Sequence, residues 1–426
     1  MTFSSLAVLL SLSSLLAVPR AAGEEIPPST RPMGLSELLA EAERNNPQIQ
    51  AARHGWQASQ QTATQVSTLP DPQFLLQHVS VGSPRPFAGY SNSDFAYVGL
   101  GLSQDIPYPG KLRLRGEIAR KDADVLQQRY ECVHRAVLAD VKMAYFQLVY
   151  LAKRRAILEG DAQLLRQLEQ AVDAHYRGGM GNQQELIQAQ LQQTRLLQET
   201  TQNEWEAGKM QAQLKQLLNR PQTSLDIEPG ELSETQLTYG YDQLLSAAQT
   251  NNPEISGAQK MIEKQSLQVD LARKDFYPDF NLQYMWQRTD PTQFRAYYMV
   301  TLGVRLPIYR GRKQQPELAQ AQAEQSRAKS EYEMESQQVA FRLRHEFLGA
   351  EKSGELLKIY REGLIPQARA GLQAGLAAYQ SNRQNFQALL ASFLDVLKLD
   401  EEYWQILVEH ETALAQMEQL TGLPLR

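Results

Sequence analysis

The sequence SELLAEAERNNPQIQAAR (residues 36–53) contains the phrase Asn45-Asn46-Pro47, and DQLLSAAQTNNPEISGAQ (residues 242–259) repeats it as Asn251-Asn252-Pro253. A residue that precedes proline is pushed out of the α region, so a helix ends there. The second asparagine of each phrase can then cap a new helix that begins at the proline. The phrase therefore predicts a joint between two helices, and the chain contains this joint twice.

The two phrases belong to a long internal repeat. At the same offset of 206 positions, Leu38-Leu39 matches Leu244-Leu245 and Ile49 matches Ile255. Farther along, LPDP (69–72) corresponds to YPDF (277–280). A period of this length is too long for a solenoid and indicates two copies of one elaborate unit. We expect a first repeat over 24–220, a linker over 221–240 and a second repeat over 241–426.

The first 23 residues are typical of a secretory signal peptide. An apolar run from Phe3 to Val18 precedes the small residues Ala21-Ala22-Gly23, although no basic residue comes before the run. A buried core helix is the alternative interpretation. The only cysteine of the chain is Cys132, so no intrachain disulfide can form and no cysteine is present at the cleavage site. We therefore expect residues 1–23 to be a signal peptide without N-terminal lipidation.

Each repeat contains two segments with the alternation of β-strands, about 73–82 and 95–106 in the first and about 279–288 and 296–306 in the second. Apolar side chains at every second position lie on one face of a strand. Strands of about ten residues can cross a bilayer when tilted. An ordinary half-buried hairpin would give the same pattern. The side chains that we expect to face the membrane are Phe280, Leu282, Tyr284, Trp286, Tyr298, Val300, Leu302 and Val304.

The rest of each repeat is predicted to be helical, and the helices are long. No proline occurs between 111 and 177, and apolar residues recur every seven positions, as in helices packed at shallow angles. A helix of this length extends about 100 Å. We expect a second long helix over about 313–378, kinked at Pro366, and a core position for Cys132. The predicted fold class is mainly α with a small β part.

Four strands are too few to close a membrane barrel, because the smallest such barrels have about eight. An open sheet edge cannot face lipid, since its backbone groups would lack hydrogen-bond partners. Several chains must therefore share one barrel if the strands cross a membrane. The residues alone leave two, three or four chains open.

The tandem unit, the strand pairs after PDP and PDF, the turn IPYPGKLRLR and the break YRGGMGNQQELIQAQ resemble the TolC-like outer-membrane efflux family. The resemblance covers nearly the whole chain after the signal peptide. It implies a homotrimer with a 12-stranded transmembrane β-barrel in the outer membrane of a Gram-negative bacterium and an α-helical barrel through the periplasm. It also implies two partners, a periplasmic adaptor protein and an inner-membrane pump. The spelling QDIPYPGK is similar to the heavy-metal, RND-associated branch of the family.

The resemblance also implies two functional regions in the helices. The first comprises the hairpin tips, where glycines permit a turn with positive φ and where the adaptor would dock: Tyr176, Gly178, Gly179, Gly181, Tyr379, Ser381, Asn382 and Arg383. The second is a pore constriction, which acidic residues often form in the family. Alanines 388 and 391 stand where those carboxylates are often found, so the candidates here are Glu185, Leu389, Leu390 and Asp395.

Basic residues gather where strands turn into helices, and anionic lipid headgroups would attract them. A solvated helix start is the alternative. The residues concerned are Lys111, Arg113, Arg115, Arg310, Arg312 and Lys313.

Nothing in the sequence indicates catalysis. The six histidines form no metal-binding motif, the serines no nucleophile elbow and the glycines no phosphate loop, so we expect no cofactor and no metal. The composition, with 43 basic and 48 acidic residues, does not suggest nucleic-acid binding. The predicted function is the exit duct of a tripartite efflux system. A duct for type I protein secretion and a fibrous coiled-coil envelope protein are the alternatives.

Overall fold

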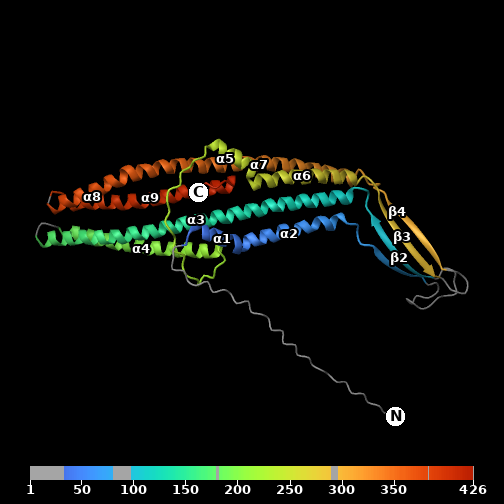
Figure 1. Cartoon of the computed structure of the whole chain (residues 1–426), viewed down its shortest axis with the longest axis horizontal. Helices are drawn as coiled ribbons and strands as arrows, with labels where there is room; N and C mark the ends of the chain where they lie inside the picture. Colours follow the sequence, from blue (N-terminus) through green and yellow to red (C-terminus); the bar gives the residue numbers. More distant parts are fainter. Residues whose placement is uncertain (1–32, 80–96, 179–181, 289–295, 382, 426) are drawn as a thin grey trace, which may run out of the picture.

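The chain forms a long rod of helices that carries a four-stranded sheet at one end (Figure 1). The computed structural model describes residues 33–79, 97–178, 182–288, 296–381 and 383–425. The predicted signal peptide lies outside these residues. So do positions 80–82, 95 and 96, which we assigned to the first two strands. The mainly helical fold with a small sheet confirms the predicted fold class.

The two repeats contain the same order of elements. In the first repeat these are α1 (Leu35–Asn45), α2 (Pro47–Ser67), β1 (Gln73–Val79), β2 (Tyr97–Ile106), α3 (Lys111–Arg177) and α4 (Gln183–Leu217). In the second they are α5 (Tyr241–Asn251), α6 (Pro253–Lys274), β3 (Asp279–Arg288), β4 (Tyr297–Arg305), α7 (Gln314–Ile359), η1 (Tyr360–Leu364), α8 (Ile365–Gln380) and α9 (Phe386–Thr421).

The repeated phrase forms the joint that the sequence predicts. Asn46 lies between α1 and α2, and its Oδ1 accepts hydrogen bonds from the backbone N–H groups of Gln48 and Ile49. Its Nδ2 donates to the carbonyl of Leu217, the last residue of α4, at 2.7 Å. The same side chain therefore starts one helix and closes the end of another, so α4 and α2 stack end to end beside α3 (Figure 1).

Asn252 makes the equivalent joint in the second repeat. Its Oδ1 caps α6, and its Nδ2 donates to the carbonyl of Leu420 near the end of α9 at 3.0 Å. Both asparagines are 2% exposed. A buried amide needs all of these partners, because an unpaired polar group in the core is destabilising.

The second long helix differs from the prediction, because it is not one α-helix. It is interrupted at η1, a π-helical turn in which the N–H of Ile365 donates to the carbonyl of Tyr360, five residues back. Pro366 follows directly. Proline lacks an N–H and its ring crowds the carbonyl four residues earlier, here that of Glu362, so the wider turn relieves the clash.

Three buried clusters hold the helices together. One lies around the middle of α3, with Phe146 and Leu151 packed against Leu214 and Leu218. The second lies toward the helix tips and the third along α7 and the end of α9. The linker between α4 and α5 crosses the helices near the middle of the rod (Figure 1). Thr235 of the linker donates to the buried carboxylate of Glu411 through both its N–H and its hydroxyl.

The sheet has the order β1-β2-β3-β4, and every neighbouring pair is antiparallel. Strands of the two repeats meet at the centre, where β2 pairs with β3. In the internal repeat, Gln73 of β1 corresponds to Asn281 of β3, and Ser103 of β2 corresponds to Gly303 of β4. Gln73 pairs with Ser103, and Asn281 pairs with Gly303, so the two hairpins have equivalent registers. Strands β1 and β4 are the edges of this sheet.

Candidate functional site

One face of the sheet is apolar and exposed. The eight side chains predicted to face the membrane form four cross-strand pairs on this face: Phe280 with Val304, Leu282 with Leu302, Tyr284 with Val300 and Trp286 with Tyr298. All are exposed, from 39% for Trp286 to 70% for Tyr298, except Phe280, which is half-buried. Strands β1 and β2 extend the same face with Phe74, Leu76, Leu100 and Leu102. An apolar face of this extent requires a covering partner or lipid.

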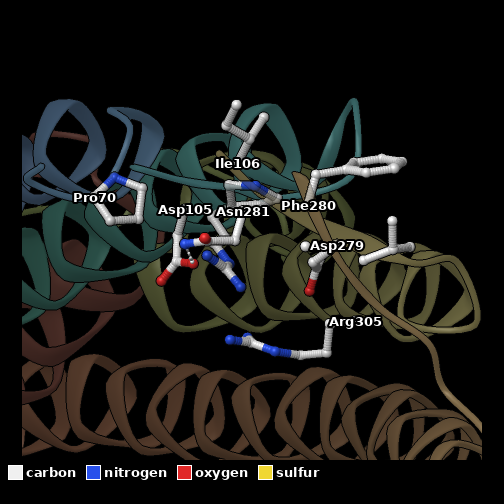
Figure 2. A pocket seen from close by; sticks show the side chains of 11 residues that line it. Pro70, Asp105, Ile106, Asp279, Phe280, Asn281 and Arg305 are labelled. Atoms are coloured by element: carbon white, nitrogen blue, oxygen red, sulfur yellow. Dashed lines mark hydrogen bonds between the residues drawn. The ribbon is translucent and has the colours of Figure 1, made fainter. Parts of the chain in front are cut away.

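The opposite face is mixed, because polar and small residues such as Asn281, Gln283 and Gly101 lie there together with Met285 and Met299. Asn281 donates through its amide to Asp105 at 2.9 Å (Figure 2). The same amide donates to Ser103 at 3.0 Å. Gly101 lies so close to β3 that a Cβ there would be 2.7 Å from the carbonyl oxygen of Tyr284. This face is therefore more polar than the apolar face, although it is not uniformly polar.

A buried ion pair fixes the junction between β2 and α3. The Lys111 ammonium is 3% exposed and lies 3.0 Å from Asp275 and 2.9 Å from Asp279. Tyr108 stacks on Tyr277 with 4.6 Å between the ring centroids, and its N–H donates to Asp279. The prediction that Lys111 faces lipid headgroups is wrong, because two carboxylates hold its charge inside the junction. Arg113, Arg115, Arg310, Arg312 and Lys313 are exposed.

The helix tips are only partly as the sequence suggests. Tyr176, Gly178, Ser381 and Arg383 are exposed at the ends of the two hairpins. Gly179, Gly181 and Asn382 lie outside the described residues. Gly178 has φ −75°, so the positive φ expected of the tip glycines does not occur at this position.

Tyr379 is a core residue, in contrast to our placing it at the docking surface. It is 3% exposed and meets Phe386 edge to face, at 6.3 Å between the ring centroids. Within α8, Leu372, Leu376 and Tyr379 follow the i, i+4, i+7 spacing of one helix face, and this signal in the sequence could have assigned Tyr379 to the core.

The candidate constriction residues divide into two groups. Glu185, in the first turn of α4, is half-buried and lies beside the hydroxyl of Tyr379. Burial and the Glu185 carboxylate raise the pKa of Tyr379 to about 12. Asp395 is exposed on α9. Leu389 and Leu390 are 1% and 9% exposed within the tip cluster, so packing between helices excludes them as a pore lining in this conformation.

A group of carboxylates that sequence reasoning missed lies between the two repeats. Asp161 of α3 is half-buried, and its Oδ2 has no hydrogen-bond partner among the described residues. Burial raises the pKa of Asp161 to about 7, and the charges of Asp400, Glu199 and Glu401 add to the effect. The neighbours are paired with arginines, since Arg369 binds Asp400 at 2.9 Å and Arg154 binds Glu401 at 2.5 Å.

The described residues contain no group of three histidine, cysteine or acidic side chains arranged to hold a metal ion. Among the described helices, none has a stretch long and apolar enough to cross a membrane.

The chain matches the outer membrane efflux protein family over residues 38–220 and 244–403, and it belongs to this family. A search of curated proteins finds no match. Three of the solved structures similar to this chain illustrate the shared fold. The outer-membrane channel OprN has a TM-score of 0.79 at 17% identity, covering 91% of this chain and 89% of that one.

CusC has a TM-score of 0.78 at 16% identity, covering 91% of each chain. The outer membrane protein VceC of Vibrio cholerae has a TM-score of 0.77 at 15% identity, covering 92% of this chain and 97% of that one. The predicted resemblance to the efflux family is thereby confirmed. At these identities the similarity to the solved structures shows the fold alone.

Proposed function

We propose that this chain is the outer-membrane exit duct of a tripartite efflux system, which passively conducts substrates expelled by an inner-membrane pump. The observation that carries the proposal is the exposed apolar face of the sheet, backed by a polar face and flanked by two open edges. Three copies would supply twelve strands, enough to close a barrel with lipid outside and water inside. The helical rod would extend from this barrel into the periplasm of a Gram-negative bacterium.

The remaining parts of the proposal concern the far end of the rod. The exposed tip residues Tyr176, Gly178, Ser381 and Arg383 would contact a periplasmic adaptor. The predicted signal peptide would direct the chain across the inner membrane. Glu185 would stand near the narrowest part of the closed duct, held by Tyr379. The efflux-family match supports a duct over a fibrous coiled-coil envelope protein.

The experiment compares two arginine substitutions on adjacent, opposite-facing residues in a Gram-negative host that lacks its own efflux ducts. Leu282→Arg places a charge on the apolar face, where it destabilises membrane insertion by about 2–4 kcal/mol per chain. Gln283→Arg places the same charge on the polar face. We expect Leu282→Arg to reduce the heat-modifiable oligomer in the outer membrane by about tenfold or more. Gln283→Arg should retain both the oligomer and its conductance in a planar bilayer.

Equal losses in the two variants would overturn the assignment of the faces, and a parent protein without conductance would overturn the proposal that the chain forms a duct.

The proposed adaptor contact is tested in the same host. Gly178→Trp should abolish drug or metal resistance while the oligomer persists. Unchanged resistance would exclude this tip as the docking surface.

A further inference from the structure

A hollow beneath the sheet crosses four helices of the chain. Its walls come from α2, α3, α6 and α7, and its volume is about 570 Å³. Sites for small molecules in proteins have volumes of about 300–1,000 Å³. The hollow is open to solvent along one side, so a molecule of this size can enter and leave it without a movement of the helices.

The hollow opens on the side of the molecule that carries the more polar face of the sheet. Arg115 lines the hollow and also lines an adjoining cavity of about 360 Å³. That cavity is bounded by Asp105, Asn281 and Arg305, whose positions in the strands place them opposite the apolar face (Figure 2). If the apolar face contacts lipid, the hollow therefore faces the interior of the duct.

The floor of the hollow is apolar, and all four helices contribute to it. The side chains that form the floor are Val66, Ile118, Ala119, Leu271, Ala272 and Ala321. Four of them are only half-buried, so water reaches part of this apolar surface in the single chain. Removing such surface from water is favourable, which suits the floor to the apolar part of a ligand.

Most charged groups around the hollow already have partners within the chain. The ion pairs are Asp122 with Lys264 at 2.5 Å, Asp275 with Lys111 at 3.0 Å and Glu324 with Arg327 at 3.1 Å. Each pair joins opposite charges, so these groups add little net charge to the hollow. They also hold α3 and α6 together around the floor, because Asp122 and Lys264 come from these two helices.

Two charges of opposite sign in the hollow have no partner in the part of the chain that the structure describes. Arg115 is exposed and Glu317 is half-buried, and neither side chain makes a hydrogen bond or an ion pair there. They do not bind each other, although both line the hollow. A partly buried carboxylate without a partner is destabilising. The hollow therefore offers one free cation and one free anion beside an apolar floor.

The internal repeat shows that the fold requires neither of these charges. Gly110 and Gly311 are equivalent, and each precedes a long helix. On this alignment Pro316 stands at the position of Arg115, and Gly116 stands at the position of Glu317. Both long helices form, although each lacks the charge that the other carries. Helix formation at this level therefore does not explain why Arg115 and Glu317 are present.

We propose that this hollow binds amphipathic zwitterions, small molecules with an apolar body, an ammonium group and an anionic group. The apolar body lies on the floor, the ammonium group binds Glu317 and the anionic group binds Arg115. Both contacts are charge-assisted hydrogen bonds, which are stronger than those between neutral groups. The inference names a substrate class for the proposed duct, and it rests on the proposed function in placing the hollow inside the duct.

Three fluorescent probes test the site on the intact oligomer held in an amphipathic polymer. Dansyl-lysine, modified on its side-chain amine, carries an apolar ring system, an ammonium group and a carboxylate. Dansylcadaverine lacks the carboxylate, and dansylaminohexanoate lacks the ammonium group. Binding is measured by the rise of dansyl fluorescence in apolar surroundings. We expect the parent protein to bind dansyl-lysine about tenfold more tightly than either singly charged probe.

Two variants assign the charges. Arg115→Gln should weaken the binding of dansyl-lysine about tenfold without weakening that of dansylcadaverine. Glu317→Gln should weaken dansyl-lysine to a similar extent without weakening dansylaminohexanoate. Arg113→Gln and Glu333→Gln are the matched controls, because they remove the same charges from exposed positions of α3 and α7 outside the hollow. Neither control should change the affinity for any probe.

Equal affinity of the parent protein for all three probes would overturn the zwitterion site, and so would equal losses in the hollow and control variants. If the parent protein conducts ions in a planar bilayer but does not prefer dansyl-lysine, the substrate class is wrong and the proposed function stands. If it prefers dansyl-lysine as expected but does not conduct, the binding site stands and the proposed function fails.

Discussion

The two repeats of this chain agree at their joints and differ at their tips. Asn46 and Asn252 have the same burial, cap the same kind of helix and bind the same kind of carbonyl. By contrast, α3 runs unbroken to its tip, whereas its equivalent contains η1 and Pro366. The comparison teaches that the two repeats build the middle of the rod in the same way, with a capped joint between stacked helices. They differ toward the tip, where only the second repeat interrupts its long helix.

The joints offer the largest expected effect. Asn46→Ala and Asn252→Ala each remove a helix cap, a loss of about 1 kcal/mol, and leave a buried carbonyl unpaired, a loss of about 1–3 kcal/mol. We expect each variant to lower the free energy of unfolding by about 2–4 kcal/mol, measured by urea unfolding of the detergent-solubilised protein. Asn45→Ala and Asn251→Ala change the exposed neighbours and serve as matched controls. Very different losses at the two joints would break the proposed equivalence.

A second prediction concerns Asp161, whose position in the second repeat is occupied by Leu364 when Tyr176 is aligned with Tyr379. Its pKa is raised from 3.8 to about 7, so the ionised carboxylate is disfavoured in the folded protein. The unfolded chain loses the proton near pH 4 and the folded chain near pH 7. Stability therefore falls as the pH rises through this window and is constant above it.

Asp161→Asn should remove this dependence. At pH 8 we expect it to stabilise the protein by about 1–2 kcal/mol, a value discounted for the partial exposure of the carboxyl. At pH 3.5 the variant and the parent should unfold at nearly the same urea concentration. A stabilisation that is equal at both pH values would show that charge is not its cause.

The tips offer the smallest effect on stability. Tyr379→Phe keeps the buried ring but removes the hydroxyl beside Glu185, so we expect a loss of about 1 kcal/mol. Because this contact joins the second hairpin to the first, single-channel conductance or open time in a planar bilayer should rise. Tyr176→Phe, on the exposed side of the other tip, is the control and should change neither quantity. If the Tyr379→Phe channel has the conductance and open time of the parent, the contact between Tyr379 and Glu185 does not restrict the pore.

The sequence was informative wherever a local rule determined the structure. Asparagine before proline located the joints, and period-two alternation located the apolar face that β3 and β4 share. Rules about one residue type were less reliable. Lys111 was assigned to the lipid headgroups because basic residues gather where strands turn into helices, and Tyr379 was assigned to the docking tip by the family resemblance. Their burial depends on Asp275, Asp279, Glu185 and Phe386, which become neighbours only when separate helices and strands pack together.

Other features of the structure also depend on tertiary contacts that the sequence does not show. Pro366 predicts a kink, but not that a π-helical turn absorbs it. The carboxylates around Asp161 come from α3, α4 and α9, so their repulsion is invisible along the sequence. The same limit applied to Leu389 and Leu390, whose spacing is compatible with either a lumen or a core.

The interruptions in the helical columns are staggered along the rod, and this has a mechanical consequence. Glu254 beside the second joint binds Arg342 of α7, while η1 begins 18 residues later, about 27 Å farther along the helix. At the level of the joint α7 is continuous, and at the level of η1 the neighbouring α9 is continuous, with Tyr360 donating to Glu402. No cross-section through these helices therefore contains both breaks. At each break a continuous neighbouring helix therefore spans the interrupted level, so the rod contains no single level at which it can hinge.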